Sequence, residues 1–461
     1  MRLMFLLIAL ILPQTGSSQI TKHRQGQILD SLPVTVSTGE TFALYLPKDH
    51  DPKNSSSVLF IFDPAGRGSK GIQPFIGGAE QYNYILICSN NSRNGPYETG
   101  LGIAERLMNH VFSHFKIDEQ RIYIAGFSGG SRLAATIAIL SDMVQGVIGC
   151  GAGFSLNTNY IPSLKDSFSY AGLVGDRDMN YQEMLKAGRW LTTMKIENEI
   201  YTYEDSHNWP PAEQLLRAFG WLELQAYKKG IKERDDIVIR RAFNDEISAA
   251  RSLENDGMIL DAVREYERSV RNFSAFLTLD TITAKVSRLK KSNTYRQGLR
   301  EIGKVARLED TLSSRFGRRF SEEESRAKST DHFKWWKKEL KKLDETYVGS
   351  DRNFLQKMGE RLRYQLFALA IESFEGHVRN NRKEKARYCS EFLMVQGPDN
   401  PFFHFRLALG FARLGQKEES LVHLEAALIN GWKDIERLHE AEEFRDLRKD
   451  PRFTHLLDKF G

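Results

Sequence analysis

The chain has 461 residues, which is enough for two or three domains. Hydrophobic residues make up 41% of the sequence and aromatic residues 11%, which excludes a chain that is disordered throughout. The formal net charge is only +5, which by itself is too small to indicate a nucleic-acid-binding protein.

The first residues have the pattern of a secretory signal peptide. Arg2 supplies a positive start, Leu3–Leu12 is an unbroken apolar run, and small residues precede a cleavage site after Ser18. The run is too short to span a bilayer as a helix. An uncleaved anchor or a buried helix is the alternative. We expect residues 1–18 to be a signal peptide and the mature chain to be secreted or periplasmic, without a membrane span.

Composition changes near residue 230. Charged residues are about twice as dense after this point, glycine becomes rare and β-rich runs disappear, as is typical of solvated helices. The first half instead alternates β-rich and helical runs, which indicates an α/β layer architecture. We therefore expect an α/β domain over 19–229 and a helical domain over 230–461.

The predicted strands of the first half begin with an antiparallel hairpin over residues 33–47, made of Val34–Ser37 and Phe42–Leu46. Six buried strands follow at Val58–Phe62, Tyr84–Cys88, Arg121–Ala125, Val147–Cys150, Ser169–Val174 and Glu199–Tyr203. Helices are expected at about Gly102–Phe115, after Ser128, at about Tyr181–Lys195 and from near Pro210 to about Lys229. This order predicts an eight-stranded, mostly parallel sheet with an antiparallel start.

The second half indicates helix-turn-helix repeats with a period of about 34 residues. In Pro401–Asn430, small and apolar residues occupy the positions that a tetratricopeptide repeat requires, and Ala386 takes the position equivalent to Ser420 one period earlier. Ala250–Phe273 has the same relative spacing, whereas the helical segment 277–360 does not keep the period. A generic helical bundle is the alternative. Such repeats bind a protein partner, mediate self-association or brace the first domain.

The most informative motif is Gly126-Phe127-Ser128-Gly129-Gly130, which lies between a strand-like and a helix-like stretch. It is a G-x-S-x-G pattern in a strand–turn–helix setting. The tight turn crowds the backbone around the serine, so the flanking positions must be small, and the hydroxyl is exposed beside the N-terminus of a helix. We therefore expect Ser128 to be a nucleophile.

A serine nucleophile needs a base and an acid that orients the base. After this kind of turn the acid and the histidine follow the serine in chain order. Asp178 lies just past a predicted strand with G-x-x-D spacing from Gly175, and Asp176 is the reserve candidate. His207 lies in a polar loop after the last predicted strand. The predicted catalytic residues are Ser128, Asp178 and His207.

An oxyanion hole needs two backbone N–H groups directed at one point. The residue after the nucleophile, Gly129, supplies the first. The loop after the Val58–Phe62 strand supplies the second, with Ala65 as first choice and Gly66 as second, because Pro64 has no N–H to donate. An ordinary glycine turn is the alternative interpretation of this loop.

These motifs together resemble the α/β-hydrolase superfamily, and within it the small secreted esterases related to polyhydroxyalkanoate depolymerases, feruloyl esterases and dienelactone hydrolases. The resemblance covers about residues 30–228 and rests on Gly126–Arg132, Gly175–Asp178 and His207–Pro210. It implies ester hydrolysis through an acyl-enzyme, in which His207 takes the Ser128 proton. Members of the family often have His-Gly at the oxyanion loop, where this chain has Asp63-Pro64.

Two other classes of function compete with a secreted esterase: a serine peptidase on the same fold, and a non-catalytic scaffold that acts through its repeats. Only about 18 residues, Gly151–Phe168, separate the sixth and seventh predicted strands, which leaves little room for a lid and favours bulky or polymeric substrates. No cofactor or metal is expected. Gly100-Leu101-Gly102 lacks the rest of a dinucleotide fingerprint, and the His110/His114 pair lacks an adjacent glutamate.

Overall fold

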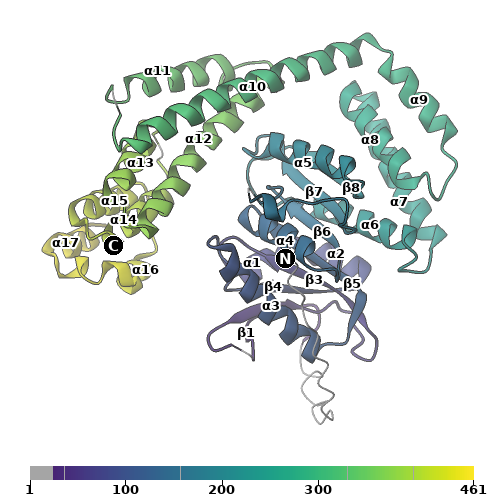
Figure 1. Cartoon of the computed structure of the whole chain (residues 1–461), viewed down its shortest axis with the longest axis horizontal. Helices are drawn as coiled ribbons and strands as arrows, with labels where there is room; N and C mark the ends of the chain where they lie inside the picture. The colour runs from purple at the N-terminus through teal and green to yellow at the C-terminus, as the bar shows by residue number, and fades with distance from the viewer. Residues whose placement is uncertain (1–23, 36, 156, 330, 398, 461) are drawn as a thin grey trace. The chain divides into compact units, whose positions relative to one another are not determined.

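The computed structural model describes residues 24–35, 37–155, 157–329, 331–397 and 399–460. By its internal contacts the chain divides into two compact units (Figure 1). Unit 1 ends at Ile302, and unit 2 begins at Gly303. The predicted signal peptide, residues 1–18, lies outside the described residues. Within the described ranges, no helix is both long enough and apolar enough to cross a membrane.

An eight-stranded sheet forms the centre of unit 1, with the strand order β1-β2-β4-β3-β5-β6-β7-β8. β1 and β2 pair antiparallel, β2 pairs antiparallel with β4, and all the other pairs are parallel. The strands are β1 (Ile28–Pro33), β2 (Thr41–Tyr45), β3 (Ser56–Phe62), β4 (Tyr84–Ser89), β5 (Ile117–Phe127), β6 (Val144–Cys150), β7 (Ser169–Gly175) and β8 (Asn198–Tyr203). The predicted fold class, a mostly parallel α/β sheet with an antiparallel start, is confirmed.

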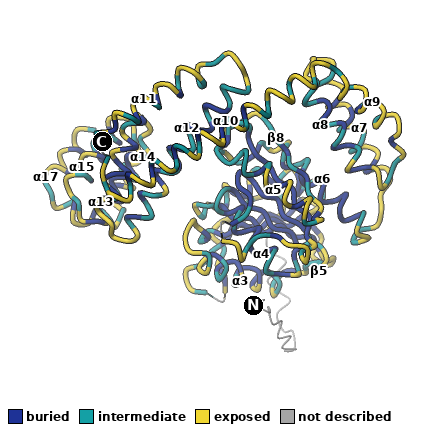
Figure 2. Tube along the Cα trace, turned by 45° about the horizontal axis from the view of Figure 1, so that its top comes forward, coloured by how far each residue is buried: buried dark blue, intermediate teal, exposed yellow. Residues whose placement is uncertain are grey.

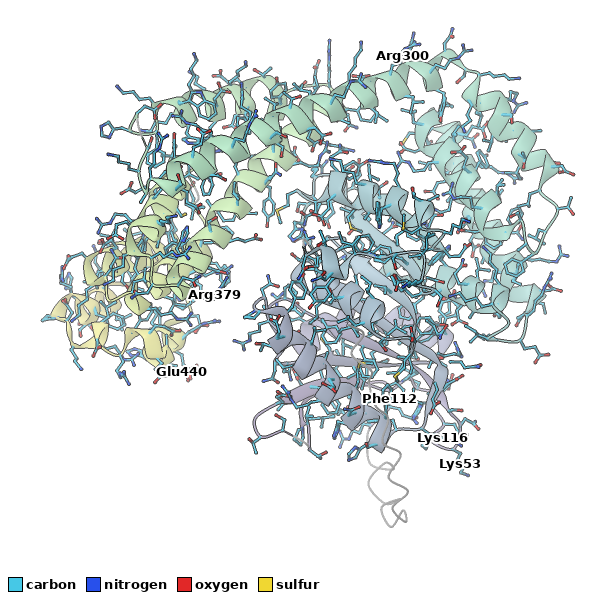
Figure 3. All side chains as sticks on the ribbon, in the orientation of Figure 1. Lys53, Phe112, Lys116, Arg300, Arg379 and Glu440 are labelled. Atoms are coloured by element: carbon cyan, nitrogen blue, oxygen red, sulfur yellow. The ribbon has the colours of Figure 1, made fainter. Side chains whose placement is uncertain are left out.

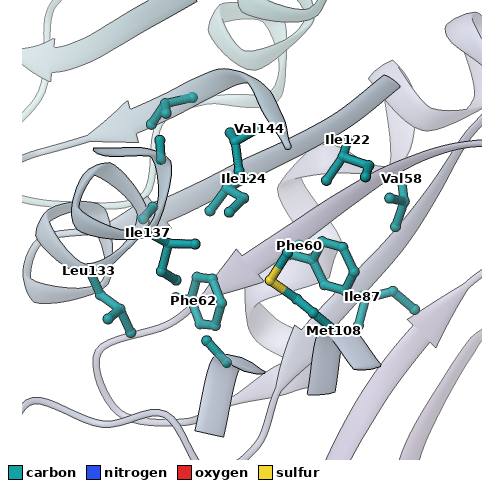
Figure 4. Close-up of a cluster of buried hydrophobic side chains, with 14 of the residues drawn as sticks. Val58, Phe60, Phe62, Ile87, Met108, Ile122, Ile124, Leu133, Ile137 and Val144 are labelled. Carbon is teal, nitrogen blue, oxygen red and sulfur yellow. The ribbon is translucent and has the colours of Figure 1, made fainter. Parts of the chain in front are cut away.

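Both faces of the sheet are buried, because helices cover each of them (Figure 2). Side chains alternate between the faces along each strand. In β3, Phe60 and Phe62 belong to one hydrophobic cluster and Leu59 and Ile61 to the other. Figure 4 shows the first cluster, in which Phe60 and Ile87 of the sheet lie beside Met108 of a covering helix.

The helices of the α/β part form two layers. The first cluster contains apolar residues of α3 (Tyr97–His114), α4 (Gly129–Leu140) and α5 (Tyr181–Thr193). The second contains residues of α1 (Gly68–Ile72), η2 (Gln73–Phe75), α2 (Ile76–Tyr82) and α6 (Ala212–Lys228). The result is a three-layer α/β arrangement, the usual solution for a parallel sheet.

Two sequence predictions for this part were wrong in detail. The first strand of the hairpin is Ile28–Pro33, not Val34–Ser37. It lies at the edge of the sheet, where Pro33 is tolerated because an edge strand need not donate every N–H. The helices α1 and α2 were not predicted, because they are short and their glycines weaken the helical signal.

Unit 1 extends beyond the predicted boundary at 229/230. The helices α7 (Asp236–Asn255), α8 (Ile259–Phe273) and α9 (Asp280–Lys290) belong to it, and the division between the units falls within α10 (Asn293–Ser325). The domain limits 19–229 and 230–461 remain a prediction. The structure adds that the first helices after residue 230 pack with the α/β layers.

Arg268 of α8 joins this helix to the edge strand β8. It is almost fully buried, its Nε donates to Glu199 Oε1 at 3.1 Å, and its Nη2 donates to the Ile200 carbonyl at 3.1 Å. Its guanidinium also pairs with Glu265 and lies 4.5 Å from the centre of the Tyr201 ring. An otherwise exposed sheet edge is thereby covered by a helix.

Replacing Arg268 by alanine removes the buried arginine that pairs with Glu199 and Glu265, so we expect the free energy of unfolding to fall by about 3–5 kcal/mol. Arg271 contacts the same Glu199 from the same helix, but its side chain is 55% exposed. Arg271→Ala is therefore the matched control, with an expected loss below about 1 kcal/mol. Denaturant unfolding measures both variants. Equal losses would show that α8 is not held by the buried arginine.

Unit 2 consists of helices paired as hairpins. α12 (Asn353–Arg379) packs with α13 (Lys383–Val395), and α14 (Pro401–Arg413) with α15 (Lys417–Ile429). The other elements are the part of α10 from Gly303 on, α11 (Lys334–Leu343), η4 (Asp344–Val348), α16 (Ile435–Glu440), η5 (Glu442–Phe444), η6 (Leu447–Lys449) and α17 (Pro451–Phe460). The equivalent residues Ala386 and Ser420 are both buried. The tetratricopeptide identity of these hairpins remains a prediction.

Two buried histidines contact each other in unit 2. The Nδ1 atoms of His404 and His423 lie 3.3 Å apart, and His423 Nε2 lies 2.8 Å from Ser390 Oγ. Burial, and secondarily the neighbouring His404, lower the pKa of His423 to about 4.

The pKa of an unfolded histidine is about 6.5. Between this pH and the folded pKa of about 4, His423 therefore binds fewer protons in the folded chain than in the unfolded chain. Stability therefore rises with pH over this window and is lost on acidification. We expect wild type to lose about 2 kcal/mol more than His423→Gln between pH 7 and pH 5. Urea unfolding at the two pH values measures the difference. Equal losses of unfolding free energy in wild type and His423→Gln would show that the pKa of His423 is not lowered in the folded chain.

Candidate active site

The three predicted catalytic residues follow strands of the sheet at their carboxyl ends. Ser128 follows β5, Asp178 follows β7 and His207 follows β8. Lys53 and Lys116 precede β3 and β5, and Figure 3 shows both near one end of the unit. Open α/β sheets bind ligands at the end opposite to this one, outside the carboxyl ends of the strands.

The backbone at Ser128 is strained. Its φ is 52° and its ψ is −119°, a combination that costs free energy for a residue with a side chain. The neighbours make this turn possible because they are glycines. A Cβ at Gly126 would collide with the Gly130 carbonyl, and a Cβ at Gly130 would collide with the Phe62 carbonyl. The residues around Ser128 must therefore be small because the backbones of β5, α4 and the neighbouring β3 approach one another closely at this turn.

The structure brings Ser128, His207 and Asp178 together. His207 Nε2 lies 3.0 Å from Ser128 Oγ, and His207 Nδ1 lies 2.8 Å from Asp178 Oδ2. The Asp178 side chain is 1% exposed and the His207 side chain 9%. A hydroxyl, an imidazole and a buried carboxylate in this order have the geometry of a base poised to take the serine proton.

The carboxylate of Asp178 is held on its other side as well. Its Oδ1 accepts the Asn180 N–H at 2.8 Å, while the Asn180 side chain donates to the Gly151 carbonyl at 2.7 Å. Of the two carboxylates considered from the sequence, the structure places Asp178 at hydrogen-bond distance from the imidazole. Asp176 donates its backbone N–H to the Tyr203 carbonyl.

The two predicted donors of the oxyanion hole differ in whether their N–H groups already have a hydrogen-bond partner. Gly129 begins α4, where N–H groups have no partner within the helix, and a Cβ at this residue would collide with the Asn94 carboxamide. Ala65 instead donates its N–H to Asp63 Oδ1 at 2.9 Å, and Gly66 donates to the Asp63 carbonyl at 3.0 Å. Neither loop N–H is directed at Ser128 in this structure, and the second donor remains a prediction.

The contacts of Asp63 were not predicted from the sequence, in which Asp63-Pro64 is only a departure from the family pattern. Its carboxylate is fully buried and accepts hydrogen bonds from Arg67 and from Trp209 Nε1, the latter at 3.1 Å. Burial alone would raise the pKa of this carboxyl, but the hydrogen bonds from Arg67, Trp209 and Ala65 outweigh it and lower the pKa below its ordinary value. Asp63 is therefore charged near neutral pH. A lone Asp-Pro after a buried strand is the only sequence signal for it.

Metal-ligand side chains also gather in unit 2. Ligand atoms of Glu324, His377 and Cys389 lie within 4.8 Å of one another. The Glu324 carboxylate is already 2.8 Å from His377 Nε2 and forms a hydrogen-bonded pair with it. We assign this group no part in the chemistry of Ser128.

No family model matches the sequence, and no curated protein matches it. Solved structures do match. An S-formylglutathione hydrolase from Staphylococcus aureus is 14% identical, with 43% of this chain and 98% of that chain covered and a TM-score of 0.35. An esterase from Pyrobaculum calidifontis is 12% identical, with 45% and 86% covered and a TM-score of 0.37. Esterase 2 from Thermogutta terrifontis is 14% identical, with 46% and 99% covered and a TM-score of 0.37. All three TM-scores lie below 0.5, and we therefore base function on the geometry of the site.

Gly151 has no side chain at a point where the side chains of Asp178 and His207 lie close by. A Cβ at this residue would lie 2.7 Å from the Phe127 ring, 3.2 Å from Asp178 Oδ2 and 3.3 Å from His207 Cε1. We expect Gly151→Ala to slow the reaction of Ser128 with a phosphonate probe by roughly 10²-fold, because it displaces the imidazole.

The control for this substitution is Gly230→Ala. Gly230 has a similar φ, +68° against +65°, but a Cβ at this residue would meet nothing within 4 Å. It carries the same backbone strain without the contacts, so the rate with the probe should match wild type. A slow Gly230→Ala variant would mean that strain, not displacement of His207, causes the loss.

Proposed function

We propose that the chain is a serine hydrolase that cleaves carboxylic esters through Ser128, His207 and Asp178. The single observation that carries the proposal is the continuous hydrogen-bonded line from Ser128 Oγ through the imidazole to the buried Asp178 carboxylate, at 3.0 Å and 2.8 Å. The strained turn at Ser128 supports it independently, because this backbone conformation exposes a nucleophilic hydroxyl above a sheet.

The proposed reaction begins when His207 Nε2 takes the Ser128 proton and Oγ attacks the ester carbonyl. Asp178 accepts the hydrogen bond from Nδ1 and so holds the imidazole in the tautomer whose Nε2 is free to accept. The tetrahedral oxyanion receives a hydrogen bond from the Gly129 N–H. His207 then gives its proton to the departing alcohol, which leaves an acyl group on Ser128.

Water completes the cycle. His207 takes a proton from a water molecule, the resulting hydroxide attacks the acyl carbonyl, and the imidazolium returns that proton to Ser128 Oγ as the acid departs. Charge develops only on the carbonyl oxygen and the imidazole. The oxyanion meets a donor at Gly129, and the imidazolium faces the buried Asp178 carboxylate.

The proposal has three further parts. The product is released outside the cytoplasm, because residues 1–18 have the pattern of a signal peptide. The substrate is bulky or polymeric, because the connection after β6 is too short for a large lid. The helical region binds a protein partner, mediates self-association or braces the α/β part through its helical hairpins.

Labelling with a fluorophosphonate, together with hydrolysis of a short-chain p-nitrophenyl ester, tests the proposed chemistry. We expect wild type to be labelled, and Ser128→Ala and His207→Ala to lose roughly 10⁴-fold or more in ester turnover, since removing one member disables the whole triad. Ser113→Ala and His455→Ala, both at exposed positions outside the site, are the controls and should match wild type.

The competing functions give different results in this experiment. Cleavage of peptides at rates above those of esters would identify a peptidase. Absence of label and of turnover in wild type would leave the helical scaffold as the function.

A further inference from the structure

Asp63 joins two loops that are distant in the sequence. Within its own loop, Oδ1 accepts the Ala65 N–H at 2.9 Å and Arg67 Nε at 3.0 Å, while Oδ2 accepts Arg67 Nη2 at 2.8 Å. Oδ2 also accepts Trp209 Nε1 at 3.1 Å, across 146 residues of sequence. One fully buried carboxylate therefore fixes both the loop after β3 and the loop after β8.

Trp209 continues this connection to the base. It follows His207 by two residues, and its indole is held between the rings of Phe75 and Phe127, with centroid distances of 5.6 Å and 5.3 Å. Phe127 is the residue before the nucleophile, and its ring lies 4.7 Å from the His207 imidazole. A rotation or shift of the indole would therefore be transmitted to the imidazole through the Phe127 ring and through the short backbone segment between the two residues.

We infer that Asp63 is a positioning residue for the reaction. Through Trp209 it fixes the imidazole of His207 in line with Ser128, and through Ala65 it sets the backbone of the oxyanion loop. The inference rests on the proposed function. Asp63 does not touch the reacting atoms. It acts by restricting the loop after β8, which carries His207, and the loop after β3, which carries Ala65.

A buried charge is suited to this task. Burying a carboxylate is costly unless charged or polar donors surround it, and Arg67, Trp209 and the backbone of Ala65 provide such donors here. A hydrogen bond to a charged acceptor is stronger than one to a neutral acceptor, so the carboxylate holds the indole more firmly than a neutral side chain would. In the loop after β3, Asp63 Oδ1 also accepts the Arg67 backbone N–H at 3.3 Å, which closes a tight turn.

The test compares Asp63→Asn, Trp209→Phe and the double variant. Asparagine replaces one oxygen by an NH₂ group that cannot accept from Trp209 or Arg67, whereas phenylalanine keeps a ring on Phe127 but removes the indole N–H. We expect each single variant to slow the phosphonylation of Ser128 and kcat for a small ester by roughly tenfold, with KM within about twofold of wild type. Since both substitutions break the same link, the double variant should lose no more than about the single variants.

Matched controls separate positioning from general destabilisation. Trp190→Phe likewise removes an indole N–H. This N–H donates to the Pro162 carbonyl at 2.9 Å, and Trp190 is an exposed residue of α5. Glu40→Gln weakens another bidentate carboxylate–arginine pair, with Arg106. Both controls should keep the wild-type rates, and thermal melts should show all the variants folded at the assay temperature.

The outcomes distinguish the inference from the function on which it rests. If wild type is not labelled and does not turn over ester, the proposed function fails. If wild type reacts but Trp209→Phe reacts as fast as Trp190→Phe, the positioning role of Asp63 is overturned. The same conclusion follows if the losses of Asp63→Asn and Trp209→Phe multiply in the double variant, because two independent effects would then explain them.

Discussion

The backbone of Ser128 is the constraint on which the rest of the site depends. A residue with a side chain adopts φ of 52° only when its surroundings enforce it. The enforcement comes from the end of β5 and the start of α4, where Gly126 and Gly130 approach the backbone so closely that any side chain would collide with it. The parallel pairing of β3 and β5 then fixes the Phe62 carbonyl beneath the turn.

Asp178 and His207 lie near Ser128 because β7 and β8 continue the same parallel sheet. Each of these strands ends in a polar loop at the same edge of the sheet, and hydrogen bonds within and between the loops hold their side chains. Asp178 is held by the Asn180 N–H, and Trp209, just beyond His207, is held by Asp63. The edge strand β8 is itself covered by α8 through Arg268, so helices after residue 230 contribute to the frame of the site.

The grouping of Ser128, His207 and Asp178 could be predicted from sequence because its signals are local. A serine between glycines after an apolar strand, a carboxylate after a strand and a histidine in a polar loop each appear within a few residues. The Asp63–Trp209 hydrogen bond has no such signal, because 146 residues separate its partners and only the folded sheet brings them together. For the same reason, the sequence could not show that the Ala65 N–H is already bonded to a carboxylate, or that Arg268 reaches Glu199. Edge strands and glycine-rich helices, such as β1 and α1, were misjudged because propensity is weak there.

The central claim is that Ser128 carries the acyl group during turnover. Rapid acid quenching of the enzyme with a slowly deacylating ester, followed by peptide mapping by mass spectrometry, tests it most directly. The account predicts an acyl adduct on the peptide that contains Ser128, formed at the rate of alcohol release and lost at the rate of acid release. Steady ester turnover with no adduct on Ser128, or an adduct on another residue that forms at the catalytic rate, would contradict it.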